Sequence, residues 1–372
     1  MRPAGRFAQE GACGGIAREE HMDTQVEFGV DTFGDITTDA SGERLSQAQV
    51  LRNVVEQGEL AERVGLDFFG VGEHHREDFA VSAPEVVLAA IGARTERIRL
   101  GSAVTVLSSD DPVRVFQRFA TLDGLTGGRA EVILGRGSFT ESFPLFGYDL
   151  AQYEALFEEK LELFVRLLDQ EPVTWEGRLR PSIRGLPVYP HVEGRLRAWI
   201  GVGGSPESVV RAAHHGLPLV LAIIGGSPAR FAPLAELYRK ALGQFGRDEL
   251  PVAVHSPGHV ADTDEQARDE LWPHYADIMG RIGRERGWGP ITRGHFEQEA
   301  GPHGALYVGS TETVAQKIAA AVRAIGVSRF DLKYSNGTLG HELMLGSIER
   351  YGTEVVPRVR ELLADPPRPA AG

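Results

Sequence analysis

The 372-residue sequence contains one cysteine, Cys13, and no long apolar run. A single cysteine excludes a disulfide framework and any zinc or iron–sulfur site built from several cysteines. No segment approaches the ~20 consecutive apolar residues of a membrane-spanning helix. Residues 1–24 lack the apolar centre of a secretory signal peptide, so we expect a disordered N-terminal extension there and a cytoplasmic protein.

Basic residues are also in deficit. The sequence has 39 Lys and Arg against 52 Asp and Glu, a formal net charge of −13. Nucleic-acid-binding proteins usually show a basic surplus or a basic stripe, and neither is present here. A polybasic membrane-surface role is equally unsupported. We therefore expect neither a nucleic acid nor a membrane as partner.

The chain has the composition of a globular protein, with 42% hydrophobic and 24% charged residues. Short apolar runs alternate with longer stretches of helical periodicity. We expect eight strands, over 26–31, 68–72, 98–106, 130–134, 198–202, 218–222, 251–260 and 330–334, each followed by a helix. This alternation predicts a parallel sheet. Eight units favour a closed (β/α)8 TIM barrel, with an open doubly wound sheet as the alternative.

The barrel is expected to form one domain over residues 25–364, followed by a frayed tail over 365–372. Two segments interrupt the alternation. Residues 171–197 are rich in proline, glycine and arginine, and we interpret them as an excursion from the barrel. Residues 280–304 contain seven glycines and little periodicity, which predicts a long mobile loop.

Active sites of such barrels lie at the carboxyl ends of the strands, so the residues that end each strand are the candidates. The second expected strand ends in Glu73-His74-His75. Adjacent side chains at a strand end point in roughly opposite directions, so one histidine would face the cavity. A histidine in the cavity can transfer protons near neutral pH. The alternative is a pair of structural histidines, and the doublet alone does not predict a metal site.

Two further strand ends suggest an anion site. After the fifth strand, Gly203 and Gly204 let the backbone approach a ligand, and Ser205 can cap the following helix. The free N–H groups and dipole of that helix end favour an anion, and Ser208 lies one turn further on. After the fourth strand, Arg136 adds a cation between two glycines. These features together favour a phosphate-bearing ligand, although an ordinary capped turn and a surface ion pair remain alternatives.

The order and spacing of these segments resemble the bacterial luciferase-like, flavin-dependent monooxygenase family, from residue 26 to the last expected helix. The motifs that carry the resemblance are, in order, Gly72-Glu73-His74-His75-Arg76-Glu77-Asp78-Phe79, Gly101-Ser102-Ala103-Val104, Asp111-Pro112-Val113-Arg114, Leu122-Asp123-Gly124-Leu125-Thr126-Gly127-Gly128-Arg129, Gly135-Arg136-Gly137-Ser138 and Phe146-Gly147-Tyr148-Asp149.

The resemblance implies a (β/α)8 barrel that binds reduced FMN (FMNH2) at its C-terminal face. His74 matches the family's active-site histidine, and Ala103-Val104 matches a non-proline cis peptide that lies against the flavin ring. Positions of the phosphate region are matched by Arg136, Ser138, Gly204, Ser205 and Ser208. Residues 280–304 match the mobile active-site loop. Luciferase itself has a carboxylate at Gly204 and a cysteine at Gly135, so light emission is not expected.

The sequence is thus interpreted as an FMN-dependent monooxygenase that oxidises a small organic substrate with O2. A separate flavin reductase is expected to supply the reduced FMN, and the family implies a homodimer. Two alternatives are an F420-dependent hydride-transfer enzyme on the same fold and a non-catalytic flavin-binding protein. Metal-dependent hydrolysis is disfavoured, because only the histidine doublet and scattered carboxylates offer ligands. The substrate's identity does not follow from the sequence.

Overall fold

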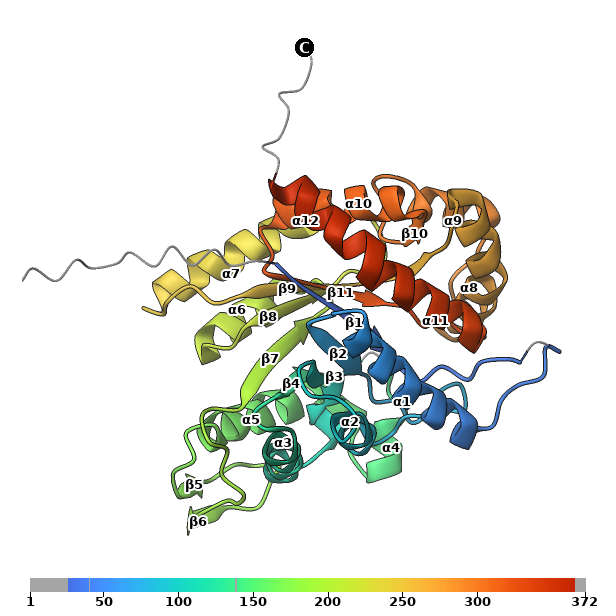
Figure 1. Cartoon of the computed structure of the whole chain (residues 1–372). Coiled ribbons are helices and arrows are strands. Elements are labelled where there is room, and N and C mark those ends of the chain that lie inside the picture. The colour runs from blue at the N-terminus through green and yellow to red at the C-terminus, as the bar shows by residue number, and fades with distance from the viewer. Residues whose placement is uncertain (1–25, 40, 138, 365–372) are drawn as a thin grey trace, which may run out of the picture.

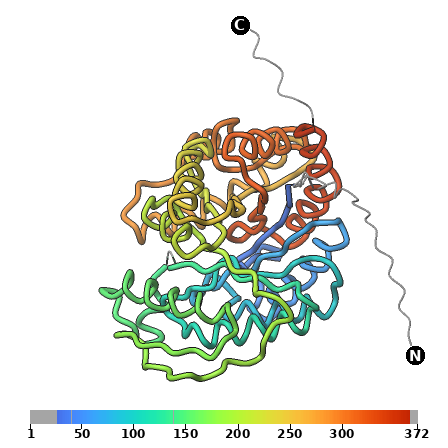
Figure 2. The backbone as a smooth tube through the Cα atoms, turned by 90° about the vertical axis from the view of Figure 1, so that its left-hand side faces the viewer, coloured from blue at the N-terminus to red at the C-terminus, as the bar shows by residue number. Residues whose placement is uncertain are grey.

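A computed structural model describes residues 26–39, 41–137 and 139–364 (Figure 1). Eight parallel strands follow one another around a closed barrel in the order β1-β2-β3-β4-β7-β8-β9-β11. The ring closes because β1 pairs with β11 and β9 pairs with both β8 and β11. The first and last strands of the barrel therefore lie side by side although the whole chain separates them (Figure 2). Closure confirms the (β/α)8 barrel and excludes the open sheet.

The barrel strands agree with the expected ones to within one residue at each end. Their bounds are β1 Glu27–Thr32, β2 Phe68–Val71, β3 Arg99–Val106, β4 Ala130–Gly135, β7 Arg197–Val202, β8 Leu219–Ala222, β9 Val252–Val260 and β11 Arg329–Lys333. Three short strands of the described residues lie outside the ring. β5 (Val173–Trp175) and β6 (Ile183–Leu186) form an antiparallel hairpin within the 171–197 excursion. β10 (Tyr307–Gly309) pairs in parallel with the last residues of β9.

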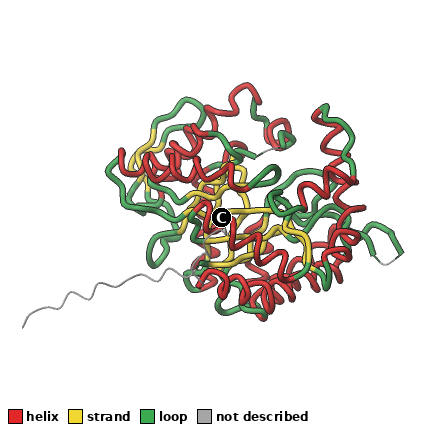
Figure 3. Tube along the Cα trace, turned by 90° about the horizontal axis from the view of Figure 1, so that it is seen from above, coloured by secondary structure: helices red, strands yellow, loops and turns green. Residues whose placement is uncertain are grey.

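Helices surround the strands, as the view from above shows (Figure 3). The α-helices are α1 Gln47–Arg63, α2 Pro84–Gly92, α3 Pro112–Thr126, α4 Ser142–Phe146, α5 Tyr153–Leu167, α6 Pro206–His215, α7 Ala232–Gln244, α8 Asp264–Arg286, α9 Arg293–Ala300, α10 Thr311–Ile325, α11 His341–Arg350 and α12 Val356–Ala364. Short 3-10 or π turns precede or join several of them: η1 Leu107–Ser109, η2 Leu150–Gln152, η3 Pro228–Phe231 and η4 Tyr351–Val355. No helix among the described residues is long and apolar enough to cross a membrane.

Side-chain caps begin several helices, among them the cap at Ser205 that the sequence predicts. Ser46 Oγ accepts a hydrogen bond from the N–H of Gln49. Asp111, which directly precedes Pro112 in the first turn of α3, accepts one from the N–H of Val113 through Oδ1. Ser205 Oγ likewise accepts from the N–H of Ser208 at the start of α6. Each cap satisfies a backbone donor that the first helical turn leaves without a partner, which fixes where the chain turns back from strand to helix.

The prediction of a long loop over 280–304 was wrong for most of that segment. α8 continues through Gly280 to Arg286, and α9 occupies Arg293–Ala300, so regular structure is absent mainly over 287–292. The glycines in this segment suggested a loop, but tertiary packing overrides that weak local preference. Phe296 on α9 is fully buried against the rings of Trp272 and Tyr275 of α8.

The interior of the barrel combines an apolar layer with buried charges. Phe68, Ile133, Trp199, Val220 and Ala253 form a small inner cluster, on which Ala103 and Val104 pack. The guanidinium of Arg329 lies 4.1 Å from the centre of the Phe68 ring and forms ion pairs with Glu131 and Asp331. The larger core lies between the strands and the outer helices.

Candidate active site at the barrel mouth

The residues expected to form a site lie at the carboxyl ends of four neighbouring strands. His74 follows β2, Ala103 and Val104 lie near the end of β3, Arg136 follows β4, and the 203–208 turn follows β7. Because β2, β3, β4 and β7 are adjacent in the barrel, these ends share one side of its mouth. That edge is where active sites of (β/α)8 barrels are built.

The peptide bond between Ala103 and Val104 is cis, as the resemblance implies. Both residues are only half-buried, so they present small apolar surfaces at the mouth. Two glycines make room for Val104. A Cβ built on Gly135 would lie 2.5 Å from Val104 Cγ2, and one on Gly201 would lie 3.0 Å from Cγ1. We call Ala103, Val104, Gly135 and Gly201 the apolar shelf.

His74 lies among aromatic rings. Its imidazole stacks on Phe79 at 4.3 Å between ring centres and meets the rings of Phe33 and Phe139 edge-on at 4.9 and 5.2 Å. The side chain has no hydrogen-bond partner among the described residues. Burial lowers the pKa of His74 to about 3, with the nearby cations Lys333 and Arg76 acting in the same direction. His74 is therefore neutral at physiological pH.

His75 points to different neighbours, as the strand-end geometry predicts. Its Nε2 lies 2.8 Å from Glu73 Oε1, and its ring meets Phe146 edge-on at 5.0 Å. Beside it is a cavity of about 360 Å³ whose walls include Glu85, Asp110 and Tyr148. The described residues contain no group of three or more metal-ligating side chains.

A pair of arginines and two serines gather where the anion site is expected. Arg136 and Arg211 both form ion pairs with Glu154 on α5, the second at 3.4 Å. Arg211 also donates to Ser208 Oγ at 3.2 Å, and Ser208 N–H donates to Ser205 Oγ. Arg211 was missed by the sequence interpretation, although its position three residues after Ser208 places it on the same helical face. Ser138 lies outside the described residues.

The two glycines before α6 have distinct roles. Gly204 has a φ of +121°, a conformation that side-chain-bearing residues rarely adopt. Gly203 has an ordinary φ, and a Cβ built there would meet no atom within 4 Å, so the backbone at this turn is open.

The second half of α8 leans over the loop that carries His74. Arg76 donates to Glu285 Oε2 at 3.0 Å, and Arg281 pairs with the buried Asp78. The guanidiniums of Arg76 and Arg286 lie over the Phe139 ring at 4.7 and 5.5 Å. These contacts, which only the folded chain reveals, attach α8 to the mouth of the barrel.

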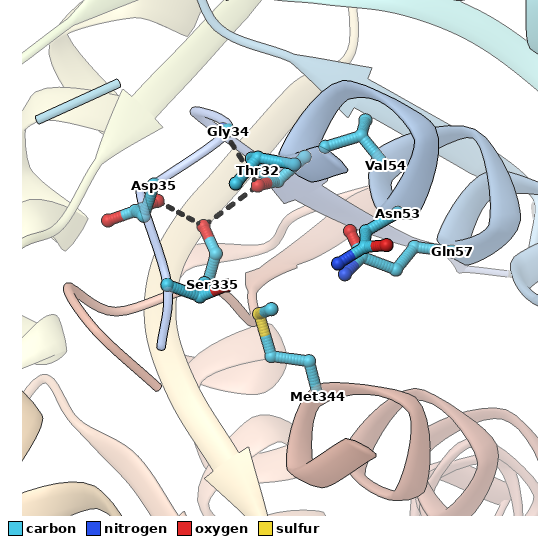
Figure 4. A pocket seen from close by; sticks show the side chains of 10 residues that line it. Thr32, Gly34, Asp35, Asn53, Val54, Gln57, Ser335 and Met344 are labelled. Carbon is cyan, nitrogen blue, oxygen red and sulfur yellow. Dashed lines mark hydrogen bonds between the residues drawn. The ribbon is translucent and has the colours of Figure 1, made fainter. Parts of the chain in front are cut away.

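A small cavity of about 10 Å³ lies between the end of β1 and α1, where Thr32, Asp35 and Gln57 line it (Figure 4). Along one side, Thr32 Oγ1 donates to Ser335 Oγ at 2.9 Å, and Ser335 Oγ donates to Asp35 Oδ2 at 2.5 Å. The N–H of Gly34 donates to Thr32 Oγ1. A space of this size holds one water molecule at most. The network joins the ends of β1 and β11 and so holds Phe33 beside His74.

Comparison with known proteins agrees with this geometry. The sequence profile described as luciferase-like monooxygenase matches residues 27–329. The chain belongs to the luciferase-like monooxygenase family. It is accordingly an oxidoreductase. The chain is 28% identical over 329 residues to a 4-hydroxyprotoasukamycin monooxygenase of Streptomyces nodosus subsp. asukaensis, covering 83% of this chain and 84% of that one. It is also 28% identical to an alkanal monooxygenase alpha chain of Photorhabdus luminescens, over 61% of each.

Solved structures of this shape include both flavin- and F420-dependent members. The monooxygenase RslO1 of Streptomyces bottropensis matches with a TM-score of 0.76 at 21% identity, over 89% of this chain and 99% of that one. The oxygenating constituent of 3,6-diketocamphane monooxygenase of Pseudomonas putida, solved with FMN, matches at 0.73 and 18%, over 90% and 99%. A coenzyme F420 dependent tetrahydromethanopterin reductase of Methanopyrus kandleri matches at 0.68 and 19%, over 90% and 99%. At these identities the likeness establishes the fold of this family member and not its cofactor.

Proposed function

We propose that the protein is an FMN-dependent monooxygenase that uses reduced FMN and O2 to oxidise a small organic substrate. One observation carries the proposal. A cationic helix end, an apolar shelf and a neutral histidine lie side by side along four consecutive strand ends. A flavin mononucleotide has the matching parts, because a flat ring is joined by a short chain to a phosphate.

The helix end fits a phosphate. The first turn of α6 presents backbone N–H groups and the positive end of the helix dipole. Gly203 leaves its backbone open, and Ser205 and Ser208 supply hydroxyls. Arg136 and Arg211 add charge that a phosphate would share with Glu154.

The shelf fits a flat ring. Ala103 and Val104 expose apolar surface, and Gly135 and Gly201 have no side chain that would displace Val104. A planar ligand placed against this surface would cover it and remove apolar area from water, which is favourable. Bound in this way, reduced FMN supplies the electrons for the reaction with O2.

The surrounding side chains position the reactants and exclude water. His74, held neutral among three phenylalanines, offers one nitrogen as hydrogen-bond acceptor and the other as donor. α8 is attached to the His74 loop through Arg76 and Glu285. A separate flavin reductase would supply the reduced cofactor, and a second copy of the chain is the expected subunit partner.

Reconstitution with purified cofactors tests the proposal. The protein is mixed with FMN or with F420, and binding is followed by the change in cofactor fluorescence. We expect FMN to bind more tightly, and FMN that is reduced by an added flavin reductase to support O2 consumption. Tighter binding of F420, with hydride transfer and no O2 consumption, would establish the F420 alternative. Binding of FMN without any oxidised product across a panel of small organic substrates would favour a flavin-binding protein.

A further inference from the structure

A second histidine, His255, lies in the barrel interior within reach of the same mouth. It belongs to β9, where it is in register with Asp331 on one neighbouring strand and Ala222 on the other. Residues in register on parallel strands point to the same side of the sheet, so the side chains of His255 and Asp331 both face inward. The His255 side chain retains about 10% of its exposure.

His255 differs from His74 in having a carboxylate partner. Its Nδ1 lies 2.7 Å from Oδ2 of Asp31, a fully buried residue on β1. Nε2 has no hydrogen-bond partner among the described residues. It is also absent from the set of fully buried polar atoms that lack a partner. The arrangement is that of a histidine oriented through one nitrogen by a carboxylate, with the other nitrogen free to exchange a proton.

The interior around this pair is rich in titratable groups. Asp331, Arg329 and Lys333 face it from β11, Glu131 from β4, Asp35 from the segment after β1, and His74 from the loop after β2. Oδ1 of Asp31 and Oδ1 of Asp331 are both buried without a hydrogen-bond partner.

One ring separates His255 from His74. Phe33 stacks on His255 with 6.0 Å between ring centres and an angle of 13°, and its edge contact with His74 is 4.9 Å. The ammonium of Lys333 lies 4.6 Å from the centre of the same ring. His255 therefore borders, through Phe33, the aromatic group that surrounds His74.

We propose that His255, oriented by Asp31, is a proton-exchanging residue of the barrel mouth. When an anionic flat ring binds, Nε2 of His255 takes a proton from water and the imidazolium offsets the ligand's negative charge. When the ligand leaves, Nε2 returns that proton to water, and Nδ1–H remains bonded to Asp31 throughout. This inference rests on the proposed function, because the ring is taken to be that of reduced FMN.

Proton uptake on binding tests the proposal without any turnover. Reduced FMN is titrated anaerobically into the protein at pH 8 in two buffers of different ionisation enthalpy, and the difference in heat gives the protons exchanged. We expect net proton uptake by the wild type and at least a fivefold smaller uptake in His255→Gln. Asp31→Asn provides a second variant with the same expected direction, in case one of the two does not fold.

His259→Gln is the matched control. His259 lies on the same strand and is also paired with a carboxylate, Glu270, at 2.7 Å, but it is 1% exposed and packs against α8. Its substitution should leave the proton count unchanged. An unchanged count in a folded His255→Gln protein that still binds reduced FMN would overturn this inference alone. Failure of the wild type to bind reduced FMN would overturn the proposed function and the inference together.

Discussion

The backbone N–H of Glu73 donates a hydrogen bond of 3.2 Å to the carbonyl oxygen of Val104. This bond joins the loop that carries His74 to the neighbouring strand, directly after its cis peptide. The carboxylate of Glu73 adds a second link, because its Oε2 accepts from the N–H of Val106 at 2.9 Å. The two bonds hold the His74 loop against the strand that carries Ala103 and Val104 of the apolar shelf.

Adding a methyl group next to Val104 should disturb the apolar shelf. In Gly135→Ala the new Cβ would lie 2.5 Å from Val104 Cγ2, closer than side-chain carbons approach, so Val104 must shift. Overpacking of this kind costs about 1–3 kcal/mol of unfolding free energy, and we also expect weaker FMN binding. Urea unfolding and fluorescence titration measure the two effects.

Gly124→Ala is the control for that substitution. Gly124 is an exposed residue of α3, and a Cβ there would meet no atom within 4 Å. Alanine should raise the unfolding free energy by about 0.5–1 kcal/mol, because glycine is the poorer helix former. FMN affinity should not change. Equal losses of affinity in the two variants would contradict the assignment of the shelf to the flavin ring.

The phosphate assignment predicts a selective loss in Arg211→Gln. A charge-assisted hydrogen bond contributes about 1.5–3 kcal/mol, so the affinity for FMN should fall about 10- to 100-fold. Riboflavin lacks the phosphate, and its affinity should change little. Arg166→Gln removes an exposed arginine of α5 that pairs with Glu162 and serves as control. If riboflavin and FMN lose affinity equally, Arg211 does not bind the phosphate.

The lowered pKa of His74 should make the stability of the ligand-free protein depend on pH. Its folded-state pKa is about 3, against 6.5 for the ordinary side chain, so between these values only the unfolded chain takes up the proton. The unfolding free energy should therefore fall as the pH drops below about 6.5, by at most ~1.4 kcal/mol per pH unit from this residue.

His74→Gln should remove that part of the pH dependence. Urea unfolding of both proteins at pH 8, 7, 6 and 5 measures the difference. The two curves should run parallel above pH 7, where His74 is neutral in both states, and diverge below pH 6. Parallel curves down to pH 5 would show that His74 accepts a proton in the folded protein.

The ion pair between Arg76 and Glu285 should affect the local opening of α8 more than the free energy of global unfolding. Glu285 is exposed, and Arg76 lowers the pKa of its carboxyl below the usual range, chiefly through their hydrogen bond. Exposed pairs contribute about 0–1 kcal/mol, so Glu285→Gln should change the unfolding free energy by less than that.

Hydrogen exchange measures the local effect. Backbone amides of residues 281–292 should exchange up to about fivefold faster in Glu285→Gln, the factor that corresponds to roughly 1 kcal/mol. Glu162→Gln, which breaks a comparably exposed pair on α5, should leave those amides unchanged. Unaltered exchange in Glu285→Gln would mean that other contacts hold α8 in place.

Much of the fold was predictable because it depends on local signals. Ser46, Asp111 and Ser205 cap helices where their side chains can reach backbone donors, and the barrel strands differ from the expected ones by at most one residue at each end. The opposite orientation of His74 and His75 followed from strand geometry. α9 was not predictable in this way, because its stability comes from burial of Phe296 against α8.

The sequence by itself determined the eight-unit alternation, the strand ends that carry polar residues, and through its motifs the family. These properties depend on hydrophobic periodicity, capping and turn chemistry, which act between residues close in the chain. Only the tertiary structure decided that Arg211 joins Arg136 at one helix end, and that Asp31 meets His255 across the barrel. Those contacts join residues far apart in the chain, and their partners are chosen when the eight strands close into a ring.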